Sequence, residues 1–106
     1  MKDHKYIERI IKYINKINRF MIDVDSYERF ITNEEKVDAV IFNLEQIGET
    51  VKKISEEYKE GHPQVEWLNI AGLRNLIAHE YEEVDYRLIY TTTKNSINEL
   101  LKVIEK

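Results

Sequence analysis

Hydrophobic residues recur at steps of three and four along most of this chain, which predicts helices rather than strands. The first such run covers residues 3–21, and Lys and Glu fill its opposite face. Its apolar positions are Ile7, Ile10, Ile11, Ile14, Ile17 and Met21. The run therefore predicts an amphipathic first helix.

A short polar break at residues 23–26 separates this helix from the next elements. Ser26 is expected to cap a short helix that ends near Phe30, and Thr32 or Asn33 to open a long one. The long helix is expected to continue to Tyr58, because its apolar stripe does: Val37, Val40, Ile41, Leu44, Ile47, Gly48, Val51, Ile54 and Tyr58. Gly48 lies inside that stripe, which predicts the close approach of another helix.

Gly61-His62-Pro63 is expected to end the long helix, with Gly61 in the left-handed conformation and Pro63 in the first turn of the next helix. A shorter helix is predicted for residues 63–78, with Trp67, Ile70, Ala71, Leu73 and Ile77 on its apolar face. Asp85 is the candidate cap of the last helix, whose inward positions are predicted to be Tyr86, Ile89, Ile97, Leu100 and Ile104. The three threonines at 91–93 lower helix propensity, but the surrounding periodicity outweighs them.

Four principal helices with short connections favour an all-α fold, an antiparallel up-down bundle of four to five helices. At 106 residues the chain fits one domain, 1–106. It has no cysteine, which excludes disulfides and thiolate metal sites, and His4 and His62 lack partners at metal-ligand spacing. We therefore expect no cofactor and no metal.

No apolar run reaches the roughly 18 residues that cross a bilayer, and the N-terminus leads into a charged stretch rather than a signal peptide. A cytoplasmic protein without a membrane partner is the expectation. The net charge of −4 argues against general coating of nucleic acid, although it leaves room for a small basic cleft.

Residues 74–81 place an arginine, a histidine and a tyrosine within eight positions: Arg74, His79 and Tyr81. Arginine offers a fixed fork of donors to phosphate, and histidine moves protons near neutral pH. On a continuous helix Arg74 and His79 would lie about 140° apart, and His79 and Tyr81 about 160°. Either the chain leaves helical geometry near His79, or a second copy supplies some of the groups.

The pattern Arg74-Asn75-x-x-x-His79-x-Tyr81 resembles the signature of HEPN domains, specifically of the HepT-like toxins of prokaryotic toxin–antitoxin pairs. Residues 43–49 and the lead-in Pro63…Trp67…Gly72-Leu73 are similar to the family as well, so the resemblance covers essentially the whole chain. One departure is Glu80, where the family commonly has Asp.

This resemblance implies a homodimeric, metal-independent endoribonuclease whose motif lies at the dimer interface, with Arg74 and His79 as its catalytic residues. It also implies a type VII-like toxin–antitoxin pair. The partner would be a minimal nucleotidyltransferase antitoxin that adds AMP to Tyr81.

The chemistry of RNA cleavage is compatible with this implication. RNA carries its own nucleophile, the 2′-hydroxyl, so cleavage needs a base, an acid and positive charge near the phosphoryl oxygens. A two-fold interface would bring two His79 and two Arg74 side chains into one cleft. Asn75 would either orient His79 or cap a neighbouring backbone group, and Glu49 would either support the site or lie on a solvated face.

Two other classes of function stay open. A HEPN interaction module that binds a nucleotidyltransferase without cleaving RNA would fit the acidic net charge, but it would not need the retained Arg–His pair. A plain helical dimerisation domain explains the apolar stripes and leaves the triplet unexplained. Taken by themselves, Arg74 would be an ion-pair partner of Glu49 or Glu80, and Tyr81 a half-buried aromatic residue.

Overall fold

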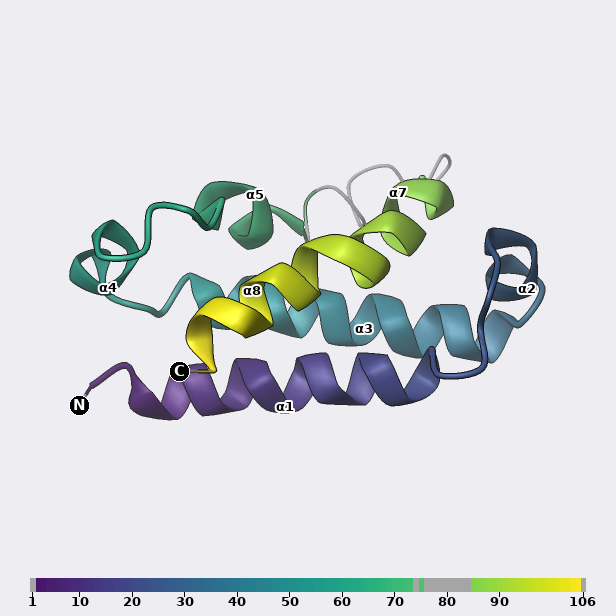
Figure 1. Ribbon diagram of the computed structural model, residues 1–106, viewed down its shortest axis with the longest axis horizontal. Helices are drawn as coiled ribbons and strands as arrows, with labels where there is room; N and C mark the ends of the chain where they lie inside the picture. The colour runs from purple at the N-terminus through teal and green to yellow at the C-terminus, as the bar shows by residue number, and fades with distance from the viewer. Residues whose placement is uncertain (1, 74, 76–84, 106) are drawn as a thin grey trace.

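The computed structural model describes residues 2–73, 75 and 85–105, and this part of the chain is helical without any strand (Figure 1). This confirms the all-α prediction. The helices are α1 (His4–Phe20), α2 (Tyr27–Ile31), α3 (Glu34–Val51), α4 (Glu56–Glu60), α5 (Trp67–Ala71), α7 (Tyr86–Thr91), the π-helical turn η1 (Thr92–Ser96) and α8 (Ile97–Ile104).

The two long helices, α1 and α3, lie antiparallel and side by side (Figure 1). α8 packs across α1, while α5 packs on the C-terminal half of α3. The first and last described residues lie at the same end of the bundle. In the described part of the chain no helix is long and apolar enough to cross a membrane.

The core is aliphatic and comes from the faces that the periodicity predicts. Ile10, Ile14 and Ile17 of α1 are fully buried, as are Val40, Leu44, Ile47 and Val51 of α3. Ile97, Leu100 and Ile104 of α8 close the core from the other side. Each buried aliphatic side chain contributes roughly 1.5–3 kcal/mol, so these three faces hold the bundle together.

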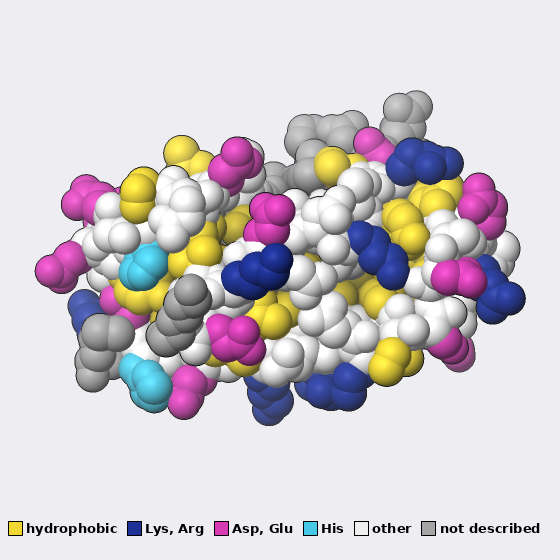
Figure 2. All heavy atoms as spheres, in the orientation of Figure 1, with side chains coloured by type: hydrophobic (Ala, Val, Ile, Leu, Met, Phe, Trp, Pro, Cys, Tyr) yellow, Lys and Arg dark blue, Asp and Glu magenta, His cyan; other side chains and the backbone are white. Residues whose placement is uncertain are grey.

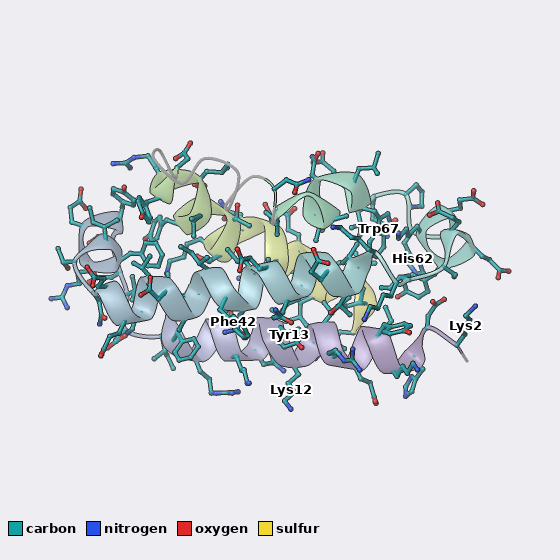
Figure 3. The ribbon with its side chains drawn as sticks, turned by 180° about the vertical axis from the view of Figure 1, so that it is seen from behind. Lys2, Lys12, Tyr13, Phe42, His62 and Trp67 are labelled. Atoms are coloured by element: carbon teal, nitrogen blue, oxygen red, sulfur yellow. The ribbon has the colours of Figure 1, made fainter. Side chains whose placement is uncertain are left out.

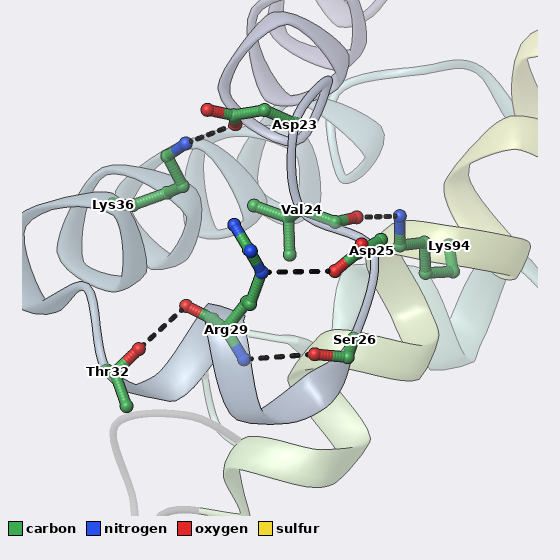
Figure 4. Close-up of polar contacts among 8 residues, drawn as sticks. All are labelled: Asp23, Val24, Asp25, Ser26, Arg29, Thr32, Lys36 and Lys94. Carbon is green, nitrogen blue, oxygen red and sulfur yellow. Dashed lines mark hydrogen bonds and ion pairs between the residues drawn. The ribbon is translucent and has the colours of Figure 1, made fainter.

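The corner between α1 and α3 is held by polar contacts (Figure 4). Ser26 and Asn33 cap α2 and α3, because their side chains accept hydrogen bonds from the amides of Arg29 and Lys36. This confirms both predicted caps. Lys94 of η1 donates to the carbonyl of Val24 at 2.8 Å and so joins the corner to the last helix.

The long helix ends seven residues earlier than predicted. α3 stops at Val51 and a separate short helix, α4, begins after Ser55. In a continuous helix the Ser55 amide would bond the carbonyl of Val51, but it donates to the carboxylate of Asp3 at 2.9 Å instead. The Ser55 hydroxyl donates to the other oxygen of Asp3 at 2.6 Å, so a residue near the start of the chain takes over the turn.

The predicted start of the fourth helix at Pro63 is wrong as well. α5 begins at Trp67, and the preceding turn is held by the indole of Trp67, which donates to the carbonyl of His62 at 3.0 Å. Gly61 ends α4 with a φ of −75°, which is not the left-handed conformation that we expected. A glycine is therefore not required there by backbone geometry.

The last helix begins where the sequence predicts, because Asp85 accepts a hydrogen bond from the Leu88 amide at 3.0 Å. Tyr86 does not point inward as expected, since its exposed fraction is 42%. The threonine stretch stays helical but widens into the π turn η1. Thr92 and Thr93 are buried there and donate their hydroxyls to the carbonyls of Leu88 and Tyr90.

Candidate functional site

The predicted site residues divide into two groups. Arg74, His79 and Tyr81 lie outside the described residues, whereas Asn75 and Glu49 lie within them. Asn75 is helical and exposed, so its amide is accessible at the surface. The convergence of the predicted residues stays a prediction, and the structure defines the framework on both sides of them.

On the N-terminal side, that framework is the contact between α5 and α3 at Gly48. A Cβ atom at Gly48 would lie 2.9 Å from the carbonyl oxygen of Ile70 and 3.6 Å from the Cβ of Leu73. The two helices therefore approach as closely as their backbones allow, which confirms the reason predicted for a glycine inside this helix. Leu73, directly before Arg74 in the chain, is buried in this contact.

Glu49 follows Gly48 on α3, beside the α5 contact. Its carboxylate pairs with Lys52 of the same helix at 3.1 Å, and its side chain is 37% exposed. A partly exposed ion pair of this kind contributes at most about 1 kcal/mol to stability, so the pair is not needed to hold α3 together. The supporting role predicted for Glu49 remains a prediction.

On the C-terminal side, Asp85 caps α7, and the helical residues that follow pack over the core through Ile89. The described chain on either side of His79 and Tyr81 is thus fixed to the bundle, by buried Leu73 before them and by buried Ile89 after them. These two points limit where on the bundle the proposed site can lie.

A surface groove of about 740 Å³ runs between α5 and the last helix. Its apolar lining includes Leu68, Leu73, Leu88 and Val103, and Gly72 lies in its wall. Leu68 is 89% exposed, although Trp67 and Ile70 on the same helix are buried. The groove does not follow from the periodicity of either helix, and its one signal in the sequence is Leu68, a leucine outside the apolar stripe of its helix.

The two histidines outside the motif have structural contacts. The Nδ1 of His62 lies 2.8 Å from the carbonyl oxygen of Tyr58, so Nδ1 carries the hydrogen, and its ring stacks on Tyr58 with centroids 4.3 Å apart. The Nε2 of His4 lies 3.1 Å from a carboxylate oxygen of Glu8 at the surface. Within the described ranges no group of three or more His, Asp or Glu side chains could hold a metal ion.

Comparison with known proteins identifies the family. The family model for HepT-like ribonucleases matches residues 10–106. The chain belongs to the HepT-like ribonuclease family. Membership supports a ribonuclease of the HEPN type, and it confirms the resemblance that the motif indicates.

Relatives from several organisms match over most of the chain. A protein of Methanocaldococcus jannaschii whose name marks it as a candidate RNase is 40% identical over 101 residues, which cover 95% of this chain and 86% of its own length. A similarly named protein of Caldanaerobacter subterraneus is 40% identical over 81 residues, 76% of this chain and 72% of its own. The "Probable ribonuclease HepT" of Thermococcus cleftensis is 35% identical over 106 residues, 99% and 96% of the two chains. No solved structure matches the chain significantly.

Proposed function

We propose that this protein is a metal-independent endoribonuclease, the toxin of a type VII-like toxin–antitoxin pair, with Arg74 and His79 as its catalytic residues. The observation that carries the proposal is the Arg74-x-x-x-x-His79-x-Tyr81 triplet inside a chain that belongs to a ribonuclease family. We also propose that residues 1–106 form one HEPN-like domain, because the family match extends over nearly all of them.

In the proposed reaction the 2′-hydroxyl of RNA attacks the adjacent phosphorus, and the bond to the 5′-oxygen breaks. One His79 accepts the proton of the 2′-hydroxyl, and a second His79 donates a proton to the leaving oxygen. Arg74 stabilises the negative charge that develops on the phosphoryl oxygens, through the paired donors of its guanidinium. No metal ion enters these steps.

The second His79 requires a second copy of the chain, so the proposal includes a homodimer. Trp67 is 8% exposed and belongs to the core, so an interface at this segment uses other residues. Leu68 and the apolar groove beside it support an interface at the same segment, because a leucine that is 89% exposed gains from burial. In this dimer the two motif segments face each other.

Tyr81 is the proposed site of control. A partner nucleotidyltransferase would transfer AMP to its hydroxyl, two residues from His79. The added phosphate would compete for the guanidinium of Arg74 and would repel an incoming RNA backbone. This supports loss of cleavage on modification without any change in fold.

A second candidate function is a HEPN interaction module that binds the nucleotidyltransferase and does not cleave RNA. The net charge of −4 favours it, since an enzyme that acts on a polyanion gains from positive charge. The two candidates differ in one measurable property, the cleavage of RNA by the purified protein.

Cleavage of labelled RNA by the purified chain tests the proposal. Arg74→Ala and His79→Ala should each lower the rate at least about 100-fold, the usual contribution of a charge-stabilising donor for Arg74 and of a general acid or base for His79. His4→Ala and Arg29→Ala are matched controls, because both side chains are exposed at 66% and 71% and lie outside the motif. Activity should persist in excess chelator.

Full activity of His79→Ala would refute the assigned chemistry. Loss of activity in chelator would refute the metal-independent mechanism. An inactive wild-type chain that still binds the nucleotidyltransferase would establish the interaction module.

A further inference from the structure

Positive charge is distributed very unevenly along this chain. The first 20 residues contain six Lys or Arg and two acids, whereas the remaining 86 residues contain ten Lys or Arg and 18 acids. An acidic protein therefore carries a cationic first helix. The position of these cations on α1 decides what they can bind.

Five of the six cations form one line on α1, which we call the α1 stripe: Lys5, Arg9, Lys12, Lys16 and Arg19. They are spaced alternately by four and three residues, so they lie within about 80° of the helix circumference and extend over about 21 Å. The stripe lies opposite the buried face of α1, and four of its members are exposed while Lys16 is half-buried.

The cations of the stripe outnumber the acids beside them, because Glu8, three residues from Lys5 and four from Lys12, is the one acid within α1. In the described part of the molecule none of the five cations forms an ion pair, and the nearest acid on the helix, Glu8, faces His4 at 3.1 Å. Figure 2 shows basic side chains along the edge of the molecule where Figure 1 places α1. In Figure 3, Lys12 points away from the bundle at this edge. Cations in a line, without acidic partners, match the regular charges of a phosphate backbone.

One flank of the stripe is aromatic. Tyr6, Tyr13 and Phe20 follow one another at seven-residue intervals, and all three are half-buried against the core with part of each ring at the surface. The Tyr6 ring lies 5.1 Å from Lys5 and 5.8 Å from Arg9, measured to the ring centroid. Basic side chains beside aromatic rings are the combination that binds single-stranded nucleic acid, because phosphates meet the cations and bases stack on the rings.

We propose that the α1 stripe binds the phosphate backbone of single-stranded RNA, as a second contact that holds the substrate while it is cleaved elsewhere on the molecule. The proposal rests on the proposed function for its choice of polyanion. The stripe lies on the side of the bundle away from α5 and α7, the helices that precede and follow the motif (Figure 1). The bundle is 28 Å across its second axis, so an RNA must be several nucleotides long to reach both places.

An anionic membrane is the other polyanion that a basic helix can meet. It fits less well, because the apolar face of α1 is buried in the core and cannot insert into a bilayer. RNA needs only the exposed face.

The test is the binding of a fluorescent single-stranded RNA of about 20 nucleotides to the wild-type chain and to two variants. All its nucleotides carry 2′-O-methyl groups, so it lacks the nucleophile and is not cut. The stripe variant is Lys5→Gln/Lys12→Gln/Arg19→Gln. The control variant, Lys53→Gln/Arg87→Gln/Lys102→Gln, removes the same charge from exposed residues elsewhere.

We expect the Kd of the stripe variant for this RNA to be at least about tenfold higher than that of the wild type near 0.1 M salt. The slope of log K against log salt should become smaller by about 2, because each of three lost phosphate contacts contributes about 0.7. The control variant should stay within about twofold of wild type. All the substituted side chains are exposed, and each variant loses one contact between a cation and a ring, Lys5 with Tyr6 or Arg87 with Tyr27, so both should melt within a few degrees of the wild type. The single variant Lys12→Glu, with a smaller expected loss, gives a second measurement if the triple variant melts early.

Equal Kd values for the stripe and control variants would overturn the proposal. Binding to phosphatidylserine vesicles that depends on the stripe, with RNA binding unchanged, would overturn it in favour of a membrane. Because binding is measured on uncut RNA, an inactive wild-type protein would refute the proposed function and leave this result interpretable. If the protein does cleave, the stripe variant should raise KM for long RNA and leave kcat unchanged.

Discussion

Gly48 is the residue through which α3 sets the position of α5, and replacing it with alanine tests that contact. The new Cβ would lie 2.9 Å from the carbonyl oxygen of Ile70, closer than real Cβ contacts allow. This oxygen belongs to a helix backbone, so it cannot move unless α5 moves. Overpacking of this kind costs about 1–3 kcal/mol, and the better helix propensity of alanine offsets about 1 kcal/mol.

We therefore expect Gly48→Ala to lower the free energy of unfolding by about 1 kcal/mol, which corresponds to a fall in Tm of about 4–8 °C in a domain of this size. Gly61→Ala is the matched control, because Gly61 is exposed at a helix end with a φ of −75° and its Cβ would meet other atoms at 3.5 Å, an ordinary contact. This control should be neutral or more stable by up to about 1 kcal/mol.

Thermal and urea unfolding, followed by circular dichroism, measure both variants. The difference between them removes the stabilisation that comes from a less flexible unfolded chain, which the two substitutions share, and shows the steric cost at Gly48. Cleavage should also fall in Gly48→Ala, because Leu73 and the motif that follows it move with α5. A Gly48→Ala protein as stable as Gly61→Ala would show that the close approach does not hold α5 in place.

The site and the fold support three more predictions. In sedimentation at micromolar concentration the chain should form a dimer of twice 12.8 kDa, and a purely monomeric species would remove the second His79 from the mechanism. Two hydrogen bonds from Ser55 lower the pKa of Asp3, and the bond from the hydroxyl has a larger effect than the bond from the amide. The stability that these bonds confer is therefore present above about pH 4 and is lost as pH falls further. Asp3→Asn should accordingly be less stable than wild type at pH 7, with a gap that narrows in acid; a gap that is constant with pH would contradict this. Tyr81→Phe should keep cleavage and escape silencing by the nucleotidyltransferase, and mass spectrometry that maps AMP to another tyrosine would refute the assignment.

The sequence predicted the parts of the fold that local chemistry decides. The core faces of α1, α3 and α8 follow from periodicity, and the caps at Ser26, Asn33 and Asp85 follow from their side chains. Both kinds of signal are contained in a few neighbouring residues. Neither depends on distant parts of the chain.

The end of α3 could not be predicted in the same way. Ile54 is buried and Tyr58 packs against the core, so the apolar spacing continues through the break as if the helix did. The break depends on the contact between Asp3 and Ser55, which are 52 residues apart in the chain. A pattern within one helix contains no information about a partner on another.

In the candidate site, too, the features set by neighbouring residues could be predicted and those set by distant contacts could not. Gly48 was predicted to mark a close helix contact, and it does, because a glycine inside an apolar helix face lowers helix propensity and is favoured there only where a side chain would not fit. The groove beside Leu68 was not predicted, since its walls come from two segments that only the fold brings together. The triplet of Arg74, His79 and Tyr81 was found from its residue types and family resemblance, and its geometry stays a prediction.

The net charge of the chain was the strongest argument against an enzyme that acts on RNA. The fold weakens this argument, because it shows where the charges lie. A phosphate backbone responds to the charge within about one Debye length, roughly 8–10 Å in physiological salt, and not to the sum over the molecule. On α1 the local charge is positive over about 21 Å, while most of the acids lie on other elements. If the proposed function holds, a cationic helix on an acidic protein would attract RNA at that helix and repel it elsewhere, so the excess of acids would direct the substrate rather than exclude it.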